Sequence, residues 1–353
     1  MLRLISLLLV ITVFISCRKE DEEETPDFNK SALLTNLSGE IILPAISQFA
    51  GDLSDLSASF DQFTADNSAA NLAVTQESLK AAYLTWQTVK IFDFGPVRNN
   101  GIKGSIGTYP SDTAVIASNI SSGSYNLSSI GNADAIGLSA LDYLLFKQGA
   151  LTSLTTDPNY TQYVADVIDK MVNEFSTVVS QWQTYKATFD ASTGTSSTSA
   201  FSELVNEFNR DFELAKTAKV GIPLGKQSLG IQLPEYIEAR YSGFSLEVLA
   251  ESVRALQNLY NGIGFNSGTN GQGFDDYLIH LEKSALDGTI DTGFTAIMNK
   301  TNSFSNTFEQ EMAVNVPELD ELYSLLQGHV VHIKTDMTSS FGVLITYQDN
   351  DGD

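Results

Sequence analysis

The chain has 353 residues, of which 42% are hydrophobic, enough for one or two globular domains with a sizeable core. Its 43 acidic and 20 basic residues give a net charge of −23 at pH 7. We therefore expect no nucleic-acid partner, because binding to phosphates requires aligned Lys and Arg side chains. Cations or a basic partner suit such a surface better.

The first 17 residues predict where the protein works. Arg3 precedes a mostly apolar run over residues 4–15, and Ser16 and then Cys17, the only cysteine of the chain, follow it. This pattern resembles a bacterial lipoprotein signal, in which the cysteine becomes the first mature residue and carries lipid. The run is too short to span a bilayer, which needs about 20 residues. We expect residues 1–16 to be a signal peptide and Cys17 to anchor an outer-membrane lipoprotein in the cell envelope through its lipid.

An acidic tether follows over residues 17–27, with five consecutive acidic residues at 20–24. A solvated, disordered tether is one interpretation of this composition. The stretch also resembles the acidic segment that follows the lipidated cysteine in surface-exported lipoproteins of the Bacteroidetes. Periplasmic and surface-exposed positions therefore both remain open.

From residue 33 onward, apolar residues recur at three- and four-residue steps, the spacing that places one face of a helix in a core. We expect Pro44 to kink or break the first helix, because proline lacks a backbone N–H and clashes with the preceding turn. Only residues 343–347 suggest a strand, so the pattern predicts an all-α fold of helical bundles. The main apolar stripes are Leu53, Leu56, Phe60 and Phe63; Leu79, Tyr83, Trp86 and Val89; Val164, Val167, Met171, Phe175, Val178 and Trp182; Leu204, Phe208, Phe212 and Ala215; Leu246, Leu249, Val253, Leu256 and Tyr260; and Leu319, Leu322, Leu326, Val330, Ile333 and Met337.

A Ser- and Thr-rich stretch at residues 190–199 divides the mature chain into two near-equal halves. This composition is typical of a domain linker. We expect an N-terminal helical bundle at residues 28–189 and a C-terminal helical bundle at residues 200–353.

Several segments, taken in order, resemble one known family. They are Trp86–Arg98, Gly107–Asp112, Gly137–Phe146, Glu238–Ser245 and the closing Gly342–Tyr347. The ordered set resembles the imelysin-like family, which includes the insulin-cleaving membrane protease and iron-regulated protein A. The resemblance covers nearly the whole mature chain and implies two helical bundles that face each other across a cleft, with the functional site in the cleft.

The resemblance also implies a signature, Gly-x-His-x-x-Glu, which underlies both activities proposed for such proteins, metallopeptidase action and iron binding. Gly137 matches it, but Ser139 occupies the histidine position and Asp142 the glutamate position. A serine hydroxyl is a poor ligand for iron or zinc, and no histidine is nearby in sequence to activate it. Asp142 is left as a candidate ligand for a hard cation such as calcium or iron. The alternative is that Gly137 serves a turn or close helix packing and that Asp142 is a solvated or paired carboxylate.

Six polar residues of the family-like segments are further candidates for the cleft. Either they line it, or the arginines among them pair with carboxylates across the domain interface and hold the bundles together. A separate candidate is His329, His332 and Asp336, whose spacing could place three metal ligands on one helix face, although we favour an ordinary polar face. Residues 349–353 resemble the start of a calcium loop but lack its closing glutamate, so we expect a turn there. The six cleft candidates are Asp93, Arg98, Tyr109, Asp112, Arg240 and Ser242.

A retained architecture with a lost motif histidine predicts binding rather than catalysis, and no residue is assigned a catalytic role. We expect an envelope-anchored, imelysin-like lipoprotein that takes part in iron or metal uptake. Its ligand could be a metal cation (iron or calcium), a metal complex, a peptide or another protein. An imelysin-type peptidase and a cell-surface scaffold are the alternatives.

Overall fold

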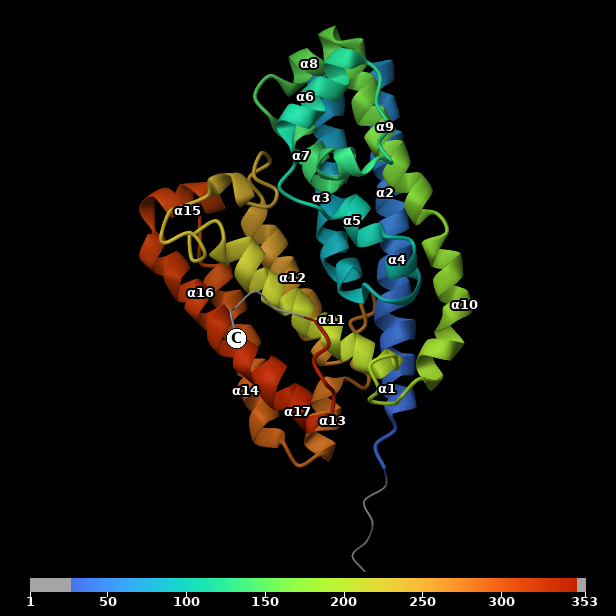
Figure 1. Cartoon of the computed structure of the whole chain (residues 1–353), viewed down its shortest axis with the longest axis vertical. Helices are drawn as coiled ribbons and strands as arrows, with labels where there is room; N and C mark the ends of the chain where they lie inside the picture. Colours follow the sequence, from blue (N-terminus) through green and yellow to red (C-terminus); the bar gives the residue numbers. More distant parts are fainter. Residues whose placement is uncertain (1–26, 348–353) are drawn as a thin grey trace, which may run out of the picture.

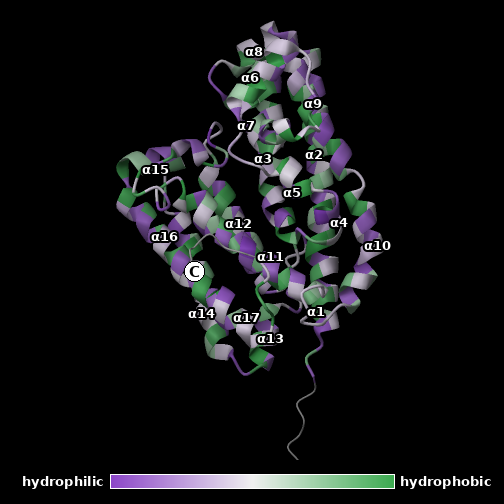
Figure 2. Ribbon diagram, in the orientation of Figure 1, coloured by the Kyte–Doolittle hydropathy of each residue, from purple (hydrophilic) through white to green (hydrophobic). Residues whose placement is uncertain are grey.

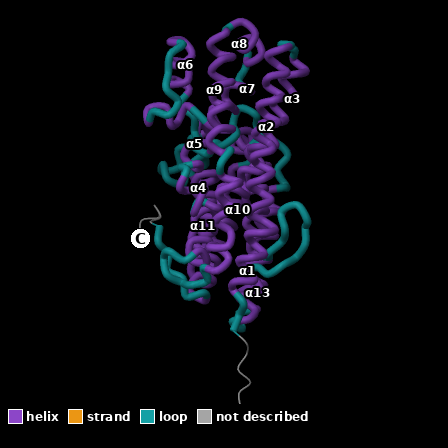
Figure 3. Tube along the Cα trace, turned by 90° about the vertical axis from the view of Figure 1, so that its right-hand side faces the viewer, coloured by secondary structure: helices purple, strands orange, loops and turns teal. Residues whose placement is uncertain are grey.

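The computed structural model describes residues 27–347, and the regular structure within them is helical (Figure 1). The predicted signal peptide, Cys17, most of the acidic tether and residues 349–353 lie outside the described residues. Figure 3 shows no strand between residues 27 and 347, where the sole bridge recorded is an isolated one between Ile263 and Asn270. The all-α fold expected from the sequence is confirmed.

The N-terminal half is built around the long hairpin of α2 and α3, against which α9 and α10 pack (Figure 1). Shorter helices pack around this group. The elements of this half are α1 (Lys30–Asn36), the π-helical segment η1 (Leu37–Ile42), α2 (Leu43–Ala65), α3 (Ala69–Val89), the 3₁₀ turn η2 (Lys90–Phe92), α4 (Gly95–Asn99), α5 (Ile102–Ile106), α6 (Thr113–Ser122), the 3₁₀ turn η3 (Ile130–Ala135), α7 (Gly137–Phe146), α8 (Ala150–Thr156), α9 (Pro158–Phe175) and α10 (Val178–Ala191).

The C-terminal half groups α12, α14 and α16 with α11 and its π-helical continuation. In Figure 1, α11 and α12 cross the middle of the molecule, between the long helices of the first half and the rest of the second. The elements of this half are α11 (Ala200–Leu214), the π-helical segment η4 (Ala215–Gly221), the 3₁₀ turn η5 (Pro234–Tyr236), α12 (Ser245–Tyr260), α13 (Phe274–His280), α14 (Ser284–Thr301), α15 (Phe308–Val314), α16 (Val316–Val330), the π-helical segment η6 (Val331–Met337) and α17 (Thr338–Ser340).

One continuous cluster of buried apolar side chains runs through both halves. Figure 2 shows hydrophobic and hydrophilic residues interspersed along the helices, as expected where one face of a helix is buried and the other is solvated. The halves pack directly on each other, α12 on α3 and α11 on η2. An open cleft between two separate bundles is therefore not confirmed. Between residues 27 and 347, no helix combines the length and the apolar character needed to cross a membrane.

Two local expectations are wrong. The helix does not break at Pro44, because helical backbone continues from α1 through the π-helical segment η1 into α2, and the change from π-helical to α-helical turns comes just before the proline, which has no N–H to donate. Residues 343–347 form no strand. They run along α11, where the Asn206 amide donates to the Leu344 carbonyl (3.0 Å) and its oxygen accepts from the Thr346 N–H (2.8 Å). A side chain thus takes the hydrogen bonds that a neighbouring strand would provide.

Candidate functional site

The altered signature lies at the start of α7. Gly137, the first residue of this helix, has φ +80°, a conformation that side chains other than glycine rarely adopt. A Cβ atom at this position would lie 2.5 Å from the carbonyl oxygen of Ile106, at the end of α5. The geometry supports the interpretation that Gly137 serves close packing of α7 against α5.

Asp142 lies in the second turn of α7 and is 2% exposed. Its carboxylate oxygens accept hydrogen bonds from the backbone N–H groups of Tyr241 (2.9 Å) and Ser242 (3.0 Å), in the loop that precedes α12. Burial raises the pKa of Asp142 to about 6, although these hydrogen bonds favour the charged form and oppose the shift. Asp142 therefore fixes a loop of the C-terminal half onto a helix of the N-terminal half.

A pocket of about 240 Å³ opens beside Asp142 and is lined by Ser139, Arg240 and Tyr241 among others. The guanidinium of Arg240 is already engaged, because it donates twice to Glu309 on α15, at 3.0 and 2.7 Å. Both residues belong to the C-terminal half, so the expectation that Arg240 pairs across the interface is wrong.

Arg98 does pair across the interface. From α4 it donates to Glu203 (3.0 Å) and Glu207 (2.8 Å) on α11. The guanidinium is half-exposed, so each pair contributes about 0–1 kcal/mol and serves alignment more than stability.

The remaining candidates separate into different places. Asp112 is the N-cap of α6 and accepts from the N–H groups of Ala114 and Val115. Ser242 donates its hydroxyl to the Ala239 carbonyl. Asp93 does not line the small pocket. The structure therefore brings Ser139, Asp142, Arg240 and Ser242 together and places Asp93, Arg98 and Asp112 elsewhere.

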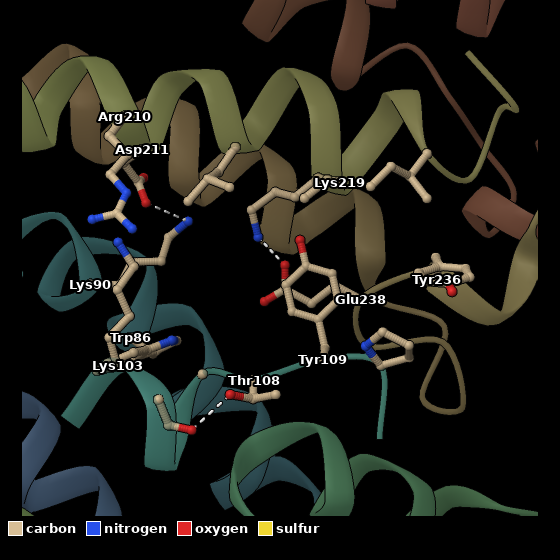
Figure 4. A pocket seen from close by; sticks show the side chains of 16 residues that line it. Trp86, Lys90, Lys103, Thr108, Tyr109, Arg210, Asp211, Lys219, Tyr236 and Glu238 are labelled. Atoms are coloured by element: carbon tan, nitrogen blue, oxygen red, sulfur yellow. Dashed lines mark hydrogen bonds and ion pairs between the residues drawn. The ribbon is translucent and has the colours of Figure 1, made fainter. Parts of the chain in front are cut away.

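Tyr109 lines a larger cavity of about 470 Å³ where the two halves meet, which we call the junction cavity (Figure 4). Its walls come from α3, η2, α5 and the loop after α5 in the first half, and from α11, η4 and residues 236–238 in the second. Apolar and aromatic walls come from Trp86, Tyr109, Pro110, Leu214, Ile222 and Tyr236, and charged groups from Lys90, Lys103, Arg210, Asp211, Lys219 and Glu238.

A buried ion pair lies in the middle of the junction cavity. Lys219, on the π-helical segment η4, donates a hydrogen bond to Glu238, and both are at most 7% exposed. Burial lowers the pKa of Lys219 to about 8, against the pull of Glu238. Burial and the charge of Glu238, to which its hydroxyl is hydrogen-bonded, raise the pKa of Tyr109 well above its ordinary value. Such π-helical segments occur frequently at functional sites.

At one end of the junction cavity, the Lys90 amine lies 3.1 Å from the carboxylate of Asp211 and donates to the Ser252 hydroxyl at 3.2 Å. Lys103 has no hydrogen-bond partner among the described residues, and burial lowers its pKa. The nearest carboxylate oxygens, of Asp93 and Glu207, are 4.0 and 3.9 Å from its amine.

The charged residues of the junction cavity were missed by sequence reasoning, although a signal was present. Lys90 follows Trp86 by four residues and Lys219 follows Ala215 by four, so both lie on faces that the apolar stripes mark as buried. Lysine is almost never fully buried without a partner, and a lysine on an apolar face therefore indicates a buried pair or a site.

No group of three or more His, Cys, Asp or Glu side chains that could hold a metal ion occurs between residues 27 and 347. His329 is 3% exposed and packs between Phe212 and Phe294, and burial lowers its pKa to about 3. His332 contacts Asp336 at the surface, at 3.3 Å. The three residues do not converge, and the expectation of an ordinary polar face is wrong for His329, which belongs to the core.

The family model described as Imelysin, Peptidase_M75, matches residues 42–330. This chain belongs to the imelysin family. A candidate iron-regulated protein A precursor from Parabacteroides distasonis ATCC 8503 has a similar solved structure, with a TM-score of 0.75 and 15% identity over 89% of this chain and 95% of that one. An imelysin-like protein from Psychrobacter arcticum 273-4 gives a TM-score of 0.73 and 15% identity, over 90% of this chain and 97% of that one. No curated protein sequence matches the chain significantly.

Membership in the imelysin family agrees with the resemblance inferred from the sequence. At 15% identity, the structural likeness shows the fold alone. Within that fold, this imelysin has serine and aspartate at positions 139 and 142, where the family-like signature has histidine and glutamate.

Proposed function

We propose that this imelysin is a binding protein of the cell envelope, anchored by a lipidated Cys17, that holds its ligand in the junction cavity and serves iron uptake. The observation that carries the proposal is the engagement of Asp142, whose two oxygens both accept backbone N–H groups, while Ser139 replaces the imidazole. A carboxylate held in this way positions the chain. It is badly placed to activate water or to complete an open metal site.

The junction cavity supports binding as the alternative to catalysis. Its volume of about 470 Å³ falls within the range of small-molecule sites, about 300–1,000 Å³. Mostly apolar walls with a few fixed polar groups are typical of such sites. The buried pairs Lys90–Asp211 and Lys219–Glu238 fix the polar groups before any ligand arrives.

The description of the Parabacteroides protein as iron-regulated supports a role in iron uptake, and the lipoprotein-like N-terminus supports an envelope position. Four cationic side chains line the junction cavity and disfavour a bare metal ion there. Iron therefore enters the cavity as a complex that carries negative charge.

Peptidase action is the competing function, and it can be tested on the mature chain, residues 17–353. We expect unfolded casein to stay intact over long incubation, with wild type and Asp142→Asn giving the same gel pattern. The reason is that no histidine lines the pocket beside Ser139, and residues 27–347 contain no cluster of three or more His, Cys, Asp or Glu side chains that could hold a metal ion. Cleavage by the wild type that is absent in Asp142→Asn would establish the peptidase instead.

Binding can be tested by calorimetric titration of the same chain with ferric citrate, and with Fe²⁺, Zn²⁺, Ca²⁺ and Mg²⁺ alone. We expect ferric citrate to bind. Any heat from the bare cations should be the same in wild type and in Asp142→Ala. Ala218→Phe should abolish binding, because Ala218 lines the junction cavity and a phenyl ring would fill it. Ala285→Phe, on an exposed position of α14, is the matched control.

Two results of this titration contradict the proposal in different ways. Absence of ferric citrate binding removes the role in iron uptake. Binding that survives in Ala218→Phe places the ligand outside the junction cavity.

A further inference from the structure

Four aliphatic side chains are exposed where α15 turns into α16, and we call them the corner patch. Leu229 and Ile231 lie in the loop between η4 and η5, the first fully exposed and the second 65% exposed. Val314 and Val316 flank the turn between the two helices and are 69% and 37% exposed. Single apolar residues are normal at a protein surface, whereas a group of them marks an interaction site.

Two contacts hold the loop against this turn. Near the start of the loop, the Lys226 amine pairs with the carboxylate of Asp320 in α16 at 2.8 Å. Near its end, the Gln232 amide donates to the Met312 carbonyl in α15 at 3.1 Å. The residues of the corner patch lie between these contacts on both segments, so the loop and the turn form one surface.

The tip of the loop has a fixed and strained backbone. Leu229 has φ +55°, in the left-handed region that residues with a side chain rarely adopt. The N–H of Gly230 donates to the Gly225 carbonyl (2.9 Å), and the N–H of Ile231 donates to the Ser228 carbonyl (3.0 Å). Since the leucine side chain is fully exposed, no packing within residues 27–347 offsets the strain. Such strain is concentrated at functional sites.

The surface around the corner patch is acidic. Within four positions of its residues, the charged side chains that reach the surface are one amine, Lys226, and three carboxylates. The amine neutralises only one of them. Lys300 contacts a second, but it also contacts Glu321, so negative charge remains in excess. The three carboxylates are those of Glu235, Glu318 and Asp320.

This charge favours one kind of occupant. A second copy of the chain would place one acidic rim against another, and the predicted tether over residues 17–27 is acidic as well. Anionic lipid surfaces attract basic segments, not acidic ones. Figure 1 shows α15 at the upper left and the start of the described chain at the bottom, so the corner patch lies away from the end that leads to the predicted anchor.

We propose that the corner patch is a docking surface for a protein partner whose contact surface combines apolar side chains with Lys or Arg. The aliphatic side chains form the apolar centre of the interface and the carboxylates its polar rim, a common arrangement at protein interfaces. Because the loop is fixed before the partner arrives, little conformational entropy is lost on binding. The inference goes beyond the proposed function, since no residue of the corner patch lines the junction cavity.

The inference can be tested on the mature chain by the fluorescence anisotropy of a labelled amphipathic helical peptide made of leucine and lysine. We expect Leu229→Asn with Ile231→Ser to weaken binding about 10-fold or more, because two apolar anchors are lost. Asparagine tolerates the left-handed conformation, so this double variant should melt at the same temperature as the wild type. Peptides with serine for every leucine, or glutamate for every lysine, should bind the wild type about 10-fold more weakly.

The matched control is Ile279→Ser with Val331→Ser, which removes two half-exposed aliphatic side chains of α13 and η6, outside the corner patch. Unchanged binding in the double variant of the patch overturns the inference, as does an equal loss in the control or equal binding of the serine peptide. Binding of the chain to phosphatidylglycerol vesicles, or formation of a dimer, that is lost in the double variant of the patch would overturn it too, in favour of a lipid surface or a second copy.

The outcome is independent of the junction cavity. Ala218→Phe should bind the leucine–lysine peptide as the wild type does, because Ala218 lines the cavity and not the corner patch. A loss of peptide binding in Ala218→Phe would place the peptide in the cavity and overturn the docking surface.

Discussion

Lys219→Met should lower the free energy of unfolding by about 3–5 kcal/mol at pH 7, measured by urea denaturation. The substitution leaves Glu238, which is 6% exposed, as a buried charge without its counter-ion. Removing one partner of a buried pair is far more costly than the pair is favourable, because the desolvation cost of the other charge remains. The hydrogen bond from Tyr109 to Glu238 is too weak to replace an ammonium.

The pH dependence follows from which state binds more protons. In the wild type, the folded pKa of Lys219 is about 8 and its ordinary value 10.5. Between these values the unfolded chain binds more protons, so wild-type stability should rise with pH there, a dependence that Lys219→Met lacks.

Two further variants separate the buried pair from a general loss of lysine. The double change Lys219→Met with Glu238→Gln should recover most of the lost stability, because no uncompensated charge remains. Lys226→Met, which removes a half-exposed pair with Asp320, should cost about 0–1 kcal/mol. A double variant as unstable as the single one would show that packing, not charge, accounts for the loss.

The helices could be predicted from the sequence because a repeat of apolar residues is a local signal. The stripe from Leu53 to Phe63 is buried within α2 as expected. The stripe from Val164 to Trp182 is buried too, but it belongs to two helices, α9 and α10, separated after Phe175. Periodicity continues through such a short break because both helices face the same core, so the pattern alone cannot locate it.

The charged groups of the junction cavity could not be predicted in the same way, because their partners come from distant parts of the chain. Lys90 meets Asp211, and Lys219 meets Glu238, only once η2, α11, η4 and the loop after η5 are packed. A single sequence shows which lysines lie on apolar faces but not which carboxylates face them. Asp112 is the contrary case, because its cap of α6 depends on residues two and three positions later.

The signature residues fall between these cases. Gly137 is explained by a positive φ and a close approach to Ile106, a constraint on the backbone that a glycine in sequence can suggest. For Asp142 the sequence indicated the position but not the role, because the N–H groups that it binds are 99 and 100 residues away. The hydrogen bonds of Asp142 agree with the interpretation of a paired carboxylate, except that its partners are backbone groups rather than a cation, and its role as a metal ligand stays a prediction.

Asp142→Ala should lower the free energy of unfolding by about 2 kcal/mol at pH 7. The N–H groups of Tyr241 and Ser242 each lose an acceptor, at about 1–3 kcal/mol apiece, and the loss is partly offset because a buried carboxylate no longer has to be desolvated. Since Glu238 lies three residues before Tyr241, release of this loop should also weaken ligand binding in the junction cavity. Asp142 would then act on the ligand as a positioning residue.

The pH dependence distinguishes this carboxylate from an ordinary salt-bridged one. The folded pKa of Asp142, about 6, lies above its ordinary value of 3.8, so the folded state binds the proton more tightly. The stability contributed by protonation is fully present below pH 3.8 and is lost as the pH rises through 6. The difference between wild type and Asp142→Ala should therefore grow by about 1 kcal/mol from pH 7 to pH 5, as each pKa unit corresponds to about 1.4 kcal/mol.

Asp142→Asn is the control for shape, because it keeps one acceptor oxygen and does not titrate. Its stability should lie above that of Asp142→Ala at pH 7, and the difference between these two variants should not change between pH 7 and pH 5. A difference between wild type and Asp142→Ala that shrinks as the pH falls would mean that a cation holds the carboxylate in its charged form. That result would return Asp142 to the role of a cation ligand, and the junction cavity would then lose the support that the engagement of Asp142 gives it.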